Sequence, residues 1–110
     1  MIEVPEANRI LRYEVPVDDE WHTHTLKGPI VHVGSRDPLV VEFWAFDCGG
    51  WEADREFRVF GTGHPLPGRR LAHHGTVVVA GGQLVWHLIE GAPTSSASPD
   101  AASGSRAVAA

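Results

Sequence analysis

Residues 71–89 read LAHHGTVVV, AGG and QLVWHLI, and this stretch decides the fold. Two runs rich in β-branched, aromatic and other apolar side chains flank a short segment that contains two consecutive glycines. Gly81 and Gly82 can adopt the left-handed backbone that tight hairpin connections require. The stretch predicts an antiparallel hairpin with strands over residues 71–79 and 83–89.

The other strands are predicted from apolar residues that alternate with polar ones. Leu11, Tyr13 and Val15 alternate with Arg12 and Glu14, and this period of two indicates a half-buried strand. No segment shows the apolar stripe and the caps of a helix. We expect an all-β fold, a small antiparallel β-sandwich or barrel of six to seven short strands. The predicted strands span residues 10–15, 20–26, 30–33, 39–46, 56–60, 71–79 and 83–89.

The segment Leu39–Phe46 is almost continuously apolar, which is typical of a strand covered on both faces. Glu42 is its one exception. Trp44 and Trp86 lie in the most apolar segments and are expected in the core.

Composition divides the chain into a folded unit and a tail. Residues 91–110 contain sixteen Ala, Ser, Gly or Pro out of twenty, too few large apolar side chains to offset the ordering entropy. We expect a loose N-terminal segment over 1–8, one all-β domain over 9–90, and a disordered tail over 91–110.

Charge and cysteine content exclude several classes of protein. The single cysteine, Cys48, excludes an internal disulfide framework. The net charge of −5 argues against nucleic acid as a partner. Apolar stretches are far shorter than the roughly 20 residues that span a bilayer, so no membrane segment is expected. The first residues lack the basic and apolar regions of a secretion signal, which favours an intracellular protein.

Several motifs carry a resemblance over roughly residues 10–90. They are YEVPVDD (13–19), FWA (43–45), FRVFGTGHP (57–65), HGT (74–76) and GGQLVWHLIE (81–90). In this order and spacing the chain resembles an uncharacterised family of small bacteriophage and prophage proteins. The resemblance implies a phage origin, a location in the cytoplasm of the bacterial host, and no established activity. The His22-Thr23-His24 segment departs from the family pattern.

The loop over residues 61–70 is the strongest candidate for a binding site. Its glycines would let backbone N–H groups converge on an anion. The side chains of Thr62, His64, Arg69 and Arg70 would supply further donors. We therefore predict a ligand site at Gly61, Thr62, Gly63, His64, Arg69 and Arg70. The alternative is a connection that only needs a left-handed backbone at its glycines and rigid prolines after them.

Seven histidines raise a second possibility, a metal site. On a strand, His22 and His24 point to one face about 7 Å apart, a spacing that suits two ligands of one metal. His32 or His87 would complete the set if the strands pair suitably. Cupins use the same His-x-His arrangement, but they also have a glutamate a few residues later. Thr25, Leu26, Lys27 and Gly28 follow here instead, so the cupin motif does not match. The alternative is exposed histidines on the outer face of the strand.

Catalysis has little support in the sequence. Cys48 has no basic neighbour to activate it, and Ser35 lacks a nucleophile elbow. We expect no enzyme activity and no cofactor. Trp51, in a polar loop, would be either a binding anchor or a cap on one end of the fold.

We interpret the chain as a non-catalytic phage-type binding protein that holds a small, nucleotide-like anion or a host protein at the 61–70 loop. Such a protein would counteract host defence. The alternatives are a histidine-ligated metal protein or hydrolase, and a structural or virion accessory protein. Self-association into a homo-oligomer is also expected, because a small open sheet has edges to cover.

Overall fold

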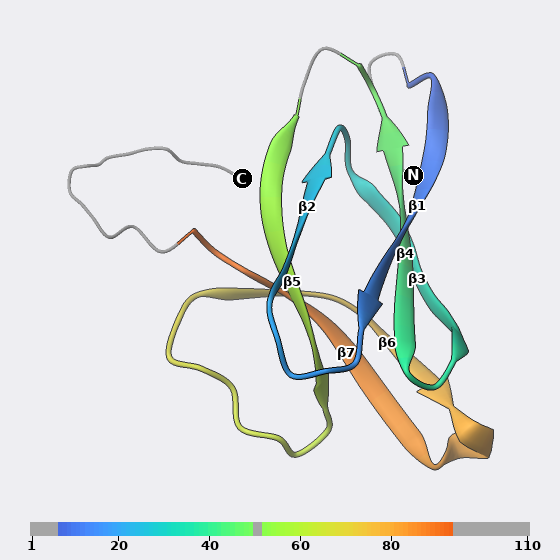
Figure 1. The fold of residues 1–110 in the computed structure, drawn as a ribbon, viewed down its shortest axis with the longest axis vertical. Coiled ribbons are helices and arrows are strands. Elements are labelled where there is room, and N and C mark those ends of the chain that lie inside the picture. Colours follow the sequence, from blue (N-terminus) through green and yellow to red (C-terminus); the bar gives the residue numbers. More distant parts are fainter. Residues whose placement is uncertain (1–6, 50–51, 94–110) are drawn as a thin grey trace.

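The computed structural model describes residues 7–49 and 52–93, and in these residues the fold is all-β, as predicted (Figure 1). Each of the seven predicted segments forms a strand. The elements in chain order are β1 (Arg9–Pro16), β2 (His22–Leu26), β3 (Ile30–Asp37), β4 (Val40–Asp47), β5 (Ala53–Gly61), β6 (Leu71–Val79), the 3₁₀ turn η1 (Ala80–Gly82) and β7 (Leu84–Gly91). Among the described residues, no helix is long and apolar enough to cross a membrane.

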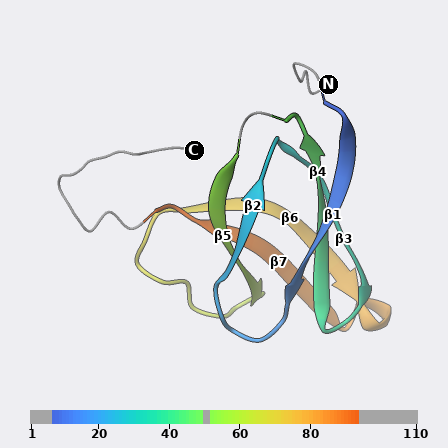
Figure 2. The ribbon, with the colours of Figure 1, turned by 45° about the horizontal axis from the view of Figure 1, so that its top comes forward.

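The strands form two antiparallel sheets that face each other, with the order β1-β4-β3 in one and β2-β5-β7-β6 in the other (Figure 2). The hydrophobic core lies between them and is built from side chains that are fully buried. The three-stranded sheet contributes Val15, Val41 and Phe43, and the four-stranded sheet contributes Phe57 and Leu88. The period of two seen in the sequence is the alternation of these inward side chains with outward polar ones.

The β6–β7 hairpin forms as predicted, with Gly81 at φ 65° and Gly82 at φ 95°. Both values lie in the left-handed region that favours glycine. Trp86 packs against the core from β7, and its indole Nε1 donates to the carbonyl of Pro38 at 2.9 Å.

The expectation that residues 39–46 are covered on both faces is wrong. Only the face with Val41 and Phe43 meets the other sheet, whereas Trp44 is half-buried on the opposite face beside His32. Glu42 shares that outer face, yet its side chain is only 5% exposed because two arginines cover it.

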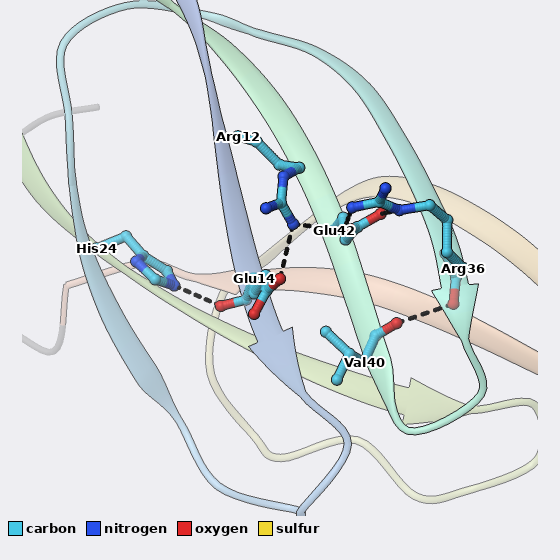
Figure 3. A network of polar contacts seen from close by, with 7 residues as sticks. Arg12, Glu14, His24, Arg36, Val40 and Glu42 are labelled. Atoms are coloured by element: carbon cyan, nitrogen blue, oxygen red, sulfur yellow. Dashed lines mark hydrogen bonds and ion pairs between the residues drawn. The ribbon is translucent and has the colours of Figure 1, made fainter.

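The ion-pair network around Glu42 accounts for this burial (Figure 3). The carboxylate accepts hydrogen bonds from Arg12 Nη1 at 2.6 Å and from Arg36 Nη2 at 2.7 Å. The hydrogen bond from Arg36, followed by that from Arg12, lowers the pKa of Glu42 against the opposing effect of burial. One carboxylate on the middle strand thus ties β1 and β3 to β4.

The folded part of the chain extends beyond the predicted end at residue 90. β7 continues to Gly91, and the N–H of Ala92 donates to the carbonyl of Arg70 at 2.9 Å. The carbonyl of Ala92 accepts a hydrogen bond from Arg69. Residues 1–6 of the predicted loose segment and 94–110 of the predicted tail lie outside the described residues.

Truncation at two positions tests where the domain ends. A chain that stops at residue 90 is expected to lose about 1–2 kcal/mol of unfolding free energy relative to one that stops at 93, because both hydrogen bonds of Ala92 disappear. Urea unfolding of the two chains measures the difference. Equal stabilities would show that residues 91–93, including the strand pairing of Gly91, contribute nothing.

Candidate functional site

The 61–70 loop opens with a tight turn that contains Gly61 and Gly63. The N–H of His64 donates to the carbonyl of Gly61 at 3.1 Å, and Gly63 adopts φ 91°. A Cβ on Gly61 would lie 2.9 Å from Cε1 of His64, so the imidazole rests directly on the glycine backbone. Gly63 thus supplies the left-handed backbone of the turn, whereas Gly61 leaves room for the imidazole of His64.

The other end of the loop is fixed to the four-stranded sheet by Arg69. Its guanidinium lies 4.5 Å from the ring centroid of Trp21 and donates to Glu56 Oε1 at 3.1 Å. The side chain is 18% exposed, and its close approach to the backbone is possible because residue 91 is glycine. Arg69 therefore holds the loop, the strand β5 and the end of β7 together.

The structure separates the side chains that the sequence predicted would converge. Gly61, next to Thr62, pairs with Trp86, whereas Glu56, the partner of Arg69, pairs with Gly91. Five residues of strand separate the two positions, roughly 16 Å. The loop leaves the lower end of β5, swings out to one side and returns to the start of β6 (Figure 1). Thr62 and His64 stand at one end of it, and Arg69 and the exposed Arg70 at the other.

Thr62 instead belongs to a group of polar side chains on the outer face of the four-stranded sheet, which we call the imidazole–hydroxyl cluster: Thr62, His73, Thr76 and His87. Thr62 Oγ1 lies 2.7 Å from His87 Nε2. On the other side of the same ring, His87 Nδ1 lies 2.9 Å from Thr76 Oγ1 and 3.3 Å from His73 Nε2. His73 Nε2 and Thr76 Oγ1 are 3.0 Å apart. His87 is half-buried and the other three side chains are exposed.

A β-bulge in β6 creates this cluster. Thr76 pairs with His87, but the register shifts between His73 and Gly75, so that His73 pairs with Ile89. Without the shift, His73 would point to the opposite face of the sheet from Thr76. The bulge turns His73 outward toward His87, and His74 points inward.

His74 takes part in a partly buried ion-pair network on the inner side. Glu90 accepts hydrogen bonds from Arg55 Nε at 2.7 Å and Nη2 at 2.8 Å, and its Oε1 lies 2.7 Å from His74 Nε2. Burial opposes ionisation of the carboxyl, but the hydrogen bonds from Arg55 and His74 outweigh it and hold the pKa at about 2. The Arg55 and Glu90 side chains are 17% and 13% exposed, so the pair is structural.

A known protein family matches most of this chain. The model of a domain of unknown function, DUF7352, matches residues 6–98. The chain belongs to this family. No curated protein and no solved structure matches it significantly. The likeness to an uncharacterised family, expected from the sequence motifs, is confirmed at that level.

In this DUF7352 domain the histidines proposed as metal ligands do not come together. His22 and His24 share one face of β2, as their spacing predicts, but it is the inner face that also carries Leu26. His22 Nε2 lies 2.8 Å from Asp18 Oδ1, and His24 Nε2 donates to the carbonyl of Glu14 at 2.9 Å. His32 lies in the other sheet against Trp44. Within residues 7–49 and 52–93, no three His, Cys, Asp or Glu side chains form a metal-ligating group.

Trp51, predicted as an anchor or a cap, lies outside the described residues of the DUF7352 domain. The imidazole–hydroxyl cluster was not predicted from the sequence. Its two histidines stand 14 positions apart, and only the hairpin register brings them together. The predicted hairpin is enough to place Thr76 opposite His87. It does not predict the bulge that brings His73 next to them.

Proposed function

We propose that this protein is a non-catalytic binding protein that holds a small anionic ligand at the Thr62 end of the 61–70 loop. The observation that supports the proposal most is the imidazole–hydroxyl cluster. It gathers two hydroxyl groups and two imidazoles on the outer face of the four-stranded sheet, and three of these four side chains are exposed.

Hydrogen-bond donors explain why the ligand would be an anion. When His87 Nε2–H donates to Thr62 Oγ1, the hydroxyl hydrogen of Thr62 is free to point outward. An oxyanion such as phosphate accepts a hydrogen bond from a hydroxyl group that is free in this way. Arg69 and Arg70, at the far end of the loop, are not part of this proposed site.

The resemblance to small phage and prophage proteins suggests where such a binding protein would act. In a host cytoplasm, a protein that holds a nucleotide-like signal would counteract a host defence that depends on that signal. A host protein as the ligand, and a structural role in the virion, are the competing proposals. Self-association also stays a prediction.

Titration with inorganic phosphate and adenosine monophosphate, followed by NMR of the backbone amides, tests the proposed site. Thr62→Val keeps the shape of the side chain and removes its donor, so it is expected to weaken binding by about tenfold. Thr25→Val is the matched control, because Thr25 is an exposed strand threonine whose hydroxyl bonds to Asp54 outside the cluster. Equal affinities of Thr62→Val and the wild type would contradict the proposal.

A further inference from the structure

We propose that His73 and His87 bind a divalent transition metal ion of the zinc class, with Thr76 as a third, weaker ligand. This site lies on the Nδ1 side of the His87 ring, whereas the anion site proposed above lies on its Nε2 side. The two proposals share the contact between His87 Nε2 and Thr62 Oγ1, but they place their ligands on opposite sides of the His87 ring. The metal site also differs from the set His22, His24 and His32 considered from the sequence.

The spacing of the two ring nitrogens fits a shared ion. His73 Nε2 and His87 Nδ1 are 3.3 Å apart. Two imidazole nitrogens, each at 2.0–2.1 Å from zinc and at a tetrahedral angle, stand about 3.3–3.4 Å apart. The hairpin therefore holds both nitrogens at the separation that the ion requires, without movement of the backbone.

The third ligand atom of the proposed site is the hydroxyl oxygen of Thr76. Thr76 Oγ1 lies 3.0 Å from His73 Nε2 and 2.9 Å from His87 Nδ1, so the three atoms form a nearly equilateral triangle. An ion placed just above this triangle would contact all three atoms from one side. The exposed surface leaves its remaining positions to water.

Thr62 accepts the hydrogen bond that a metal-bound histidine normally donates from its other ring nitrogen. Metal-bound imidazoles donate their second N–H to a nearby acceptor, which fixes the tautomer and the orientation of the ring. Thr62 Oγ1, 2.7 Å from His87 Nε2, is such an acceptor. It would leave the lone pair of His87 on Nδ1, the atom that faces His73.

The ligand types select the class of metal. Imidazole nitrogen suits Zn²⁺, Cu²⁺ and Ni²⁺, whereas Mg²⁺ and Ca²⁺ prefer carboxylate, carbonyl and water oxygens. With only two strong ligands, the site would exchange its metal readily, unlike a closed four-ligand structural site.

Calorimetric titration of the full chain with zinc chloride in phosphate-free buffer at pH 7 tests the site. We expect one zinc ion per chain, and at least about a tenfold loss of affinity in His73→Ala and in His87→Ala. His32→Ala is the matched control, because His32 is an exposed strand histidine on the other sheet. Its zinc affinity is expected to equal that of the wild type.

Two further readouts separate ligation from a change in the fold. Thermal unfolding without zinc should give the same midpoint for His73→Ala as for His32→Ala. On zinc addition, nitrogen NMR should show the large shift at Nδ1 of His87 and at Nε2 of His73. Undiminished binding by His73→Ala and His87→Ala, or shifts at the other ring nitrogens, would overturn the proposal. Because no phosphate is present, a failure here leaves the anion proposal untouched, and the reverse also holds.

Discussion

Replacing Glu90 with alanine is expected to lower the free energy of unfolding by about 3 kcal/mol at pH 7. The loss arises because Arg55, 17% exposed, would keep its charge without the two hydrogen bonds that compensate it. His74 would lose its partner in the same step. Urea unfolding monitored by tryptophan fluorescence measures the difference.

Glu14→Ala is the matched control for this variant. Glu14 also accepts a hydrogen bond from an arginine, but it is 56% exposed and its partner Arg12 is 42% exposed. Water replaces such a contact easily, so the change is expected to cost less than about 1 kcal/mol. A cost of Glu90→Ala no greater than that of Glu14→Ala would show that the buried pair does not stabilise the fold.

The pH dependence of stability provides the second readout of the Glu90 prediction. The pKa of Glu90 falls from its ordinary 4.5 to about 2 in the folded chain. Its contribution is therefore fully present above pH 4.5 and is lost as the pH falls through 2. As the pH falls between these limits, the unfolding free energy of the wild type should decrease faster than that of Glu90→Ala. The difference in stability between the two proteins should therefore shrink in acid.

The sequence predicts the strands of this fold well because the signals for a strand are local. The alternation from Leu11 to Val15 and the paired glycines after Val79 need no knowledge of the rest of the chain. The outer face of β4 could not be predicted in this way. Whether Glu42 is covered depends on Arg12 and Arg36, which come from two other strands. Trp44 packs beside His32, which also comes from another strand.

The candidate site was only partly predictable for the same reason. Neighbouring positions suggested that Thr62, His64, Arg69 and Arg70 act together. The partners of Arg69, namely Glu56, Trp21 and Ala92, lie far away in sequence and draw it to the opposite end of the loop. The bulge at His73 is equally invisible, because a shift of one residue in register leaves no local signature.

Gly75→Ala is expected to lower the free energy of unfolding by about 2–3 kcal/mol, because its methyl group forces the two sheets apart at the contact between β6 and β3. A Cβ on Gly75 would stand 2.7 Å from Cβ and 2.8 Å from Cγ2 of Val33, a residue of β3 that packs against the core. Real Cβ atoms do not approach so closely, so β6 and β3 would have to separate. Thermal and urea unfolding measure the loss.

Gly68→Ala is the control for the glycine itself, since a Cβ there meets nothing within 4 Å and its φ lies outside the left-handed region. It should leave stability unchanged or raise it slightly by restricting the unfolded chain. The double variant Gly75→Ala/Val33→Ala adds a sharper test. Alanine at 33 keeps the Cβ that makes the closest contact, so it should not rescue the fold. Full rescue would mean that a rotatable methyl group, and not the approach of the two strands, requires glycine at position 75.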